Sequence, residues 1–116
     1  MSITFFIPDS PTREVVYDEG AVDEFRTTED IWPSVNFANS NAFVLINQLA
    51  AITGLKQLEN FDYCGRWSAN EACEIAGAII ATMEDHNFPE SLVARLLRLF
   101  TVVDFAQHNN MQVCWS

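Results

Sequence analysis

A capping box in the middle of the chain, Ser68-Ala-Asn-Glu71, fixes the start of one helix. In this motif the first side chain accepts a hydrogen bond from the backbone of the fourth residue, whose own side chain binds back to the backbone of the first. Apolar residues follow at helical spacing at Ala72, Ala76, Ile79, Ile80 and Met83, and the small residues include Gly77, Ala78 and Ala81. The sequence therefore predicts a helix over 69–85, buried along this stripe and open to close approach by another backbone.

Two further helices have recognisable ends. Asn39, Ser40 and Asn41 offer N-cap side chains, and Gly54 stands where a left-handed glycine ends many helices. These signals predict a helix over 41–53. Pro89 is tolerated in a first helical turn and predicts a helix over 88–108. Its buried face is expected to be Leu92, Leu96, Leu99, Phe100 and Val103.

Short apolar runs predict strands at both ends of the chain. Ile3–Ile7 stops at Pro8, Met111–Trp115 closes the chain, and Glu14–Tyr17 is a further candidate at an edge. Residues 31–37 return the chain to the core, and residues 55–67 form an irregular connector. The predicted fold class is α+β, with a small sheet of two to three strands, N-terminal and C-terminal strands included, packed against three helices in a single domain over 1–116.

Charge sets limits on the partners. The chain has 16 acidic residues against 6 Lys and Arg, a net charge of −10, yet 49% of its residues are apolar. Such a chain folds, unlike an acidic disordered tail, and its surface is negative. That surface repels nucleic-acid phosphates and anionic membranes and attracts basic proteins. Acidity that serves solubility alone is the other interpretation.

The acidic residues gather in three doublets, Asp18-Glu19, Asp23-Glu24 and Glu29-Asp30. An extended chain would separate successive doublets by about 16 to 20 Å, and a helix by about 8 to 9 Å, which is closer to the order of successive phosphates. Carboxylates presented in this way can occupy a basic groove meant for nucleic acid. We therefore predict that Asp18, Glu19, Asp23, Glu24, Glu29 and Asp30 bind the partner, against the alternative of a solvated loop.

No pattern in the sequence predicts an enzyme, a metal site or a cofactor. Cys64, Cys73 and Cys114 have no zinc-ligand spacing with one another or with His86 and His108. Glu84-Asp85-His86 lacks an adjacent nucleophile, and a cysteine paired with His108 has no local signature. The N-terminus lacks a signal peptide, so we expect reduced thiols in a cytoplasmic protein.

Three segments, Ile3–Thr12, Val35–Ala42 and Val113–Trp115, are similar to a group of small bacterial and phage proteins without an assigned activity. That group is longer in the middle and richer in Gly and Arg there, and the resemblance transfers no site residue. It implies a bacterial or phage cytoplasm. Short acidic phage proteins are often inhibitors of host defence, including anti-CRISPR proteins that mimic DNA, and this is a class analogy.

The predicted function is therefore a non-enzymatic inhibitor that binds a basic protein, such as the nucleic-acid-binding surface of a protein complex, without contacting nucleic acid or membrane itself. One alternative is an immunity protein that neutralises a basic toxin, which demands the same charge. An alternative of another class is a small enzyme of unknown reaction.

Overall fold

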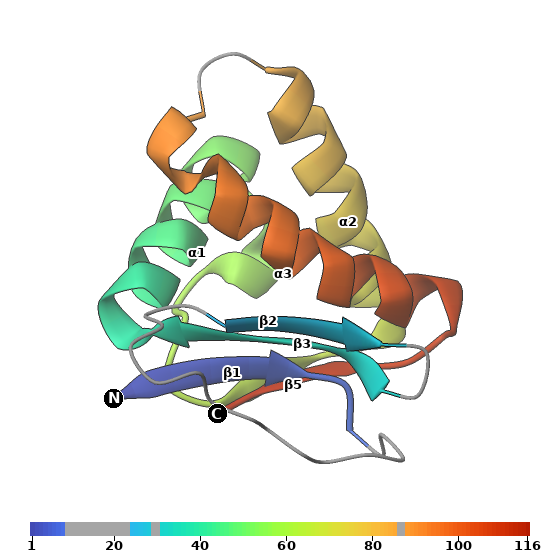
Figure 1. The fold of residues 1–116 in the computed structure, drawn as a ribbon. Helices are drawn as coiled ribbons and strands as arrows, with labels where there is room; N and C mark the ends of the chain where they lie inside the picture. Colours follow the sequence, from blue (N-terminus) through green and yellow to red (C-terminus); the bar gives the residue numbers. More distant parts are fainter. Residues whose placement is uncertain (9–23, 29–30, 86–87) are drawn as a thin grey trace.

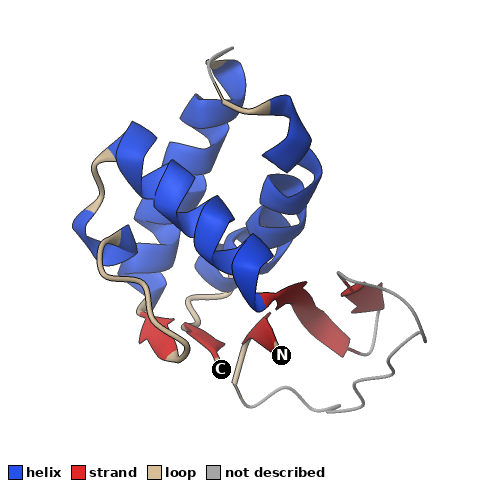
Figure 2. Cartoon of the chain, turned by 90° about the vertical axis from the view of Figure 1, so that its left-hand side faces the viewer, coloured by secondary structure: helices blue, strands red, loops and turns tan. Residues whose placement is uncertain are grey.

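The computed structural model describes residues 1–8, 24–28, 31–85 and 88–116, with only the backbone described for 24–28 and 31. Three helices cover one face of a sheet, and the sheet forms the second layer (Figures 1 and 2). The elements are β1 (Ser2–Phe6), β2 (Glu24–Thr28), β3 (Ile31–Ala38), α1 (Asn39–Thr53), the 3₁₀ turn η1 (Lys56–Leu58), β4 (Gly65–Trp67), α2 (Ala69–Glu84), α3 (Glu90–His108) and β5 (Val113–Trp115). The α+β class is confirmed.

The described strands form one antiparallel sheet in the order β2-β3-β1-β5-β4. The terminal strands β1 and β5 share this sheet, as predicted, and are neighbours in it. The described residues form five strands instead of two or three, because β2 in the acidic stretch, β3 in residues 31–38 and β4 in the expected connector were not predicted as strands. The candidate strand Glu14–Tyr17 lies outside the described residues.

Alternation along the strands separates a buried face from an open one. Ile3, Phe5, Val35 and Phe37 are buried against the helices, whereas the residues between them are more exposed. The continuous apolar run of Ile3–Ile7 predicts a strand buried on both faces, but in the described part of the chain the helices cover β1 on one face and Thr4 and Phe6 on the other are partly exposed. On the other face Asn36 Nδ2 donates hydrogen bonds to Ser2 Oγ at 2.9 Å and Thr4 Oγ1 at 2.7 Å, which links β3 to β1.

A proline explains an irregularity in β3. The register between β2 and β3 shifts between Arg26 and Thr28, opposite Trp32 and Pro33. Pro33 has no N–H to give to a ladder, so an extra residue at this position lets pairing resume beyond it. The Trp32 ring packs against Phe105 of α3, with the two ring centroids 6.0 Å apart.

The capping box of α2 is confirmed, and its buried face is rotated from the predicted one. Ser68 Oγ accepts from Glu71 N and Glu71 Oε1 accepts from Ser68 N. The buried positions are Ala72, Ile75, Ala76, Ile79 and Thr82. Ile80 and Met83 are 43% and 40% exposed, so their predicted burial is wrong. Gly77 is also exposed, and its open side meets no neighbouring element.

The ends of α1 and α3 differ slightly from the prediction. Strand β3 runs directly into α1, whose N-cap is Ala38 without a side-chain hydrogen bond, so the predicted asparagine and serine caps are wrong. Gly54 ends α1 with φ 69°, and its N–H donates to Ala50 O. In α3 the predicted face is buried except Phe100, which is half-buried against the core.

The core lies between the sheet and the helices. Leu96 and Ile79, whose burial would fix the registers of α3 and α2, are both fully buried. Within the described residues, no helix is long and apolar enough to cross a membrane.

Candidate functional site

Glu24 alone among the predicted partner-binding residues has a described backbone. It opens β2 and pairs in register with Asn36 of β3. The other five, Asp18, Glu19, Asp23, Glu29 and Asp30, lie outside the described residues. In sequence, one doublet stands at the start of β2 and the last one directly follows its end.

The backbone of β2 decides between the two spacings for part of this stretch. From Glu24 to Thr28 the chain is extended, so four residue steps cover roughly 13 Å at strand rise. The helical alternative, which came closer to the spacing of phosphates, is wrong over this interval. The second and third doublets are therefore joined by an extended segment.

Among the described strands, β2 is also an edge of the sheet, since it pairs with β3 on one side and ends the strand order. Edge strands carry unpaired backbone groups, and proteins often place charges there to prevent pairing with other chains. Two of the acidic doublets flank β2 in sequence, at positions where charge would hinder pairing with another chain. Charged edges of this kind remain accessible to a partner of opposite charge.

The rest of the surface is acidic as well, but less densely. Residues 9–30 contain eight acidic residues and two arginines, which leaves six of the ten net negative charges in this stretch. The remaining four come from the described part of the chain, where the exposed acids include Glu59, Asp62, Glu74, Glu84 and Glu90. In sequence, the charge is thus concentrated in the stretch that contains β2 and continues through the connector and helices.

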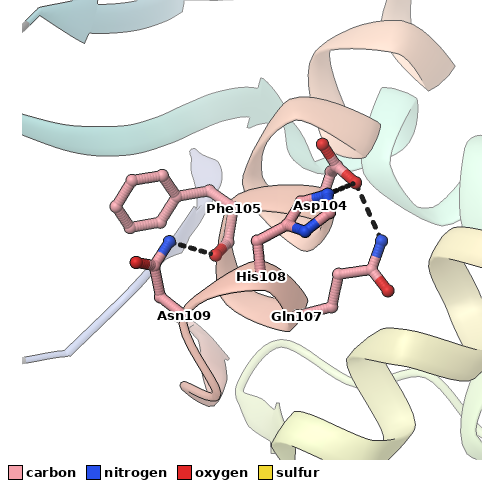
Figure 3. Close-up of polar contacts among 5 residues, drawn as sticks. All are labelled: Asp104, Phe105, Gln107, His108 and Asn109. Atoms are coloured by element: carbon pink, nitrogen blue, oxygen red, sulfur yellow. Dashed lines mark hydrogen bonds and ion pairs between the residues drawn. The ribbon is translucent and has the colours of Figure 1, made fainter.

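A histidine–carboxylate pair lies at the end of α3 (Figure 3). His108 Nε2 is 3.2 Å from Asp104 Oδ1, and Gln107 Nε2 donates to the same oxygen at 2.8 Å. Asn109 Nδ2 donates to Phe105 O at 2.8 Å, which satisfies a carbonyl of the last turn. The His108 side chain is 70% exposed, and a histidine here interacts favourably with the helix dipole. These contacts explain His108 as a residue that stabilises the end of α3.

A hollow of about 480 Å³ lies at one end of the strands, where β1 and β4 end and β3 and β5 begin. Its lining consists of Pro8, Trp32, Ser68, Ala69, Asn110, Met111 and Gln112. The volume is within the range of ligand sites. None of the lining side chains titrates near neutral pH, so these residues offer hydrogen bonds and an aromatic face but no acid–base catalysis.

The connector contains two kinds of aromatic residue, which the sequence alone did not separate. Trp67 is fully buried, and its Nε1 donates to Gln57 O at 3.1 Å. Tyr63 is 58% exposed and its ring packs edge-on against Phe43 at 5.0 Å. Trp67 therefore belongs to the core, whereas Tyr63 belongs to the surface.

Cysteines and metal ligands form no centre in the part of the chain that the structure describes. Cys64 and Cys73 are exposed and Cys114 is half-buried, and no disulfide joins the three. No cluster of His, Cys, Asp or Glu among the described residues has a geometry that could hold a metal ion. His86 of the Glu84-Asp85-His86 triplet lies outside the described residues.

No family model, curated protein or solved structure matches the chain. The resemblance to small bacterial and phage proteins stays a prediction.

Proposed function

We propose that this chain is a non-enzymatic binding protein that inhibits a nucleic-acid-handling complex by placing carboxylates in its basic groove. The observation that carries the proposal is the density of negative charge along one stretch of sequence: six of the ten net charges fall in residues 9–30, which include β2. Acids that border an edge strand of the described sheet in sequence would attract Lys and Arg of a basic partner.

The proposal does not require the acids to copy the spacing of phosphates. Because β2 is extended, the backbone spans roughly 13 Å from Glu24 to Thr28, so acids that flank it in sequence need only lie within a broad basic groove. The energy comes from long-range attraction between opposite charges, which increases the association rate and weakens as salt shortens its range.

The experiment is a pull-down from bacterial lysate with the intact chain, followed by measurement of association with the captured protein at increasing salt. Changing all six predicted residues to lysine should slow association by about 10-fold or more, on the order of lost electrostatic steering. Three of the six reversals, at Asp18, Asp23 and Glu29, are also compared with a matched variant that changes Glu74, Glu84 and Glu90, which are exposed on helices, to lysine. The matched variant should slow association less.

The outcome separates the classes of function. A captured nucleic-acid-binding protein that loses its activity supports the proposal, and a captured basic toxin favours the immunity protein instead. If neither salt nor the charge reversals change the association rate, a charge-driven function for residues 18–30 is contradicted.

A further inference from the structure

Tyr63 is an exposed aromatic residue at the end of a continuous column of rings. Its ring packs edge-on against that of Phe43, with the two ring centroids 5.0 Å apart, and the centroids of Phe43 and Phe61 are 5.1 Å apart. Phe61 stacks on Trp115 at 5.4 Å and on Phe5 at 5.9 Å, both of which are buried. The exposed ring is thus braced by the core, although more than half of the residue's surface faces solvent.

The backbone that carries Tyr63 is held in place from two sides. Asp62 Oδ1 accepts a hydrogen bond from Tyr63 N at 2.7 Å, and Trp115 Nε1 donates to Asp62 O at 2.9 Å. Upstream, Trp67 Nε1 donates to Gln57 O. A side chain on such a backbone loses little conformational freedom on binding, which is the condition for a preorganised contact.

The carboxylate of the preceding residue, Asp62, determines which chemical groups can bind beside the Tyr63 ring. Asp62 is exposed, and its carboxylate has further acceptor capacity beyond the bond to Tyr63 N. A guanidinium group can stack on an aromatic face while it binds a carboxylate in its own plane, and an ammonium group matches this arrangement less well.

We propose that Tyr63 and Asp62 form a binding point for an arginine side chain of the basic protein partner. This inference rests on the proposed function, since it gives the acidic protein a second contact on the connector. The acidic stretch would increase the association rate at long range, and the Tyr63 contact would slow dissociation by direct contact. Tyrosine and arginine are both enriched among the residues that dominate interfaces.

The experiment titrates the full chain with two short peptides of equal length and charge, one arginine-rich and one lysine-rich, and measures both affinities. We expect the arginine-rich peptide to bind about two- to five-fold more tightly, the size of an exposed cation–π contact. Tyr63→Ala should remove this preference and Tyr63→Phe should keep it. Asp62→Asn should weaken binding while its side-chain oxygen still accepts from Tyr63 N.

Two control variants change matched residues elsewhere. Leu97→Ala alters a similarly exposed apolar residue on α3, and Glu84→Gln removes an exposed acid at the end of α2. Both should retain the arginine preference. If Tyr63→Ala still prefers the arginine-rich peptide, the inference is wrong. The proposed function then still stands, provided that binding weakens with salt. If neither peptide binds the unmodified chain, both proposals are wrong.

Discussion

The two edges of the sheet differ in what holds them and in what they present. At one edge, β4 ends a connector fixed by the indole groups of Trp67 and Trp115 and by stacked rings that reach Phe5. At the other edge, β2 is joined to β3 through backbone pairing and is bordered in sequence by acidic doublets. Aromatic packing is concentrated near β4, and charge is concentrated near β2.

This separation has a physical reason. Buried rings stabilise the fold only when they are removed from water, whereas carboxylates must remain hydrated or paired. A small domain that needs both therefore places them apart. Substitutions near β4 should affect stability most, and substitutions of the acids near β2 should affect binding most.

Trp67→Ala is expected to give the largest loss of stability. Removal of a fully buried indole typically costs about 3 to 5 kcal/mol, and here it also leaves Gln57 O without its hydrogen bond. Chemical denaturation would measure the change. Trp32→Ala is the matched control, because Trp32 is only half-buried on β3 beside β2. If both variants lost the same stability, the contrast between the two edges would not hold.

Gly65→Ala should destabilise the β4 edge by about 1 to 3 kcal/mol, the cost of overpacking. A Cβ at this position would overlap the Trp115 ring, at 2.9 Å from its Cε2 and Cη2 atoms, and that ring is held between β4 and the connector. Gly77→Ala is the control, and its expected change in stability has the opposite sign. Its Cβ would meet nothing within 4 Å in the interior of α2, so the higher helix propensity of alanine should stabilise by up to about 1 kcal/mol. Thermal unfolding of both variants provides the measurement.

The helices were predictable because their signals are local. The capping box at Ser68 and the left-handed Gly54 each satisfy backbone groups within one turn, so a few adjacent residues identify each boundary. Which side of α2 is buried was less predictable. Ile79 and Ile80 are equally apolar, and the packing of α3 against α2 decides that only Ile79 is covered.

The strands and the candidate site depended on distant pairing. β4 has three residues and β2 contains charged ones, so neither shows the apolar alternation by which strands are found. β4 forms because β5, distant in sequence, pairs with it, whereas β2 pairs with β3, the next strand along the chain. The acidity of residues 14–30 was evident from composition, but its position beside an edge strand required the sheet order. The exposure of Tyr63 likewise follows from packing and not from its residue type.

Asn36→Ala tests how firmly the β2 side is attached, and its expected effect is the smallest. The Asn36 amide bridges Ser2 and Thr4 of β1, while its backbone lies opposite Glu24 of β2. Loss of these two side-chain bonds on a partly exposed face should cost about 1 kcal/mol. Ser34→Ala on the same strand is the control and should cost less, since no side-chain bond of Ser34 joins it to β1 among the described residues. Hydrogen exchange would then show faster exchange of the β1 and β3 amides in Asn36→Ala, with protection at β4 and β5 unchanged. Equal loss of protection at both edges would mean that the sheet opens as one unit, and the two edges would then differ in chemistry but not in stability.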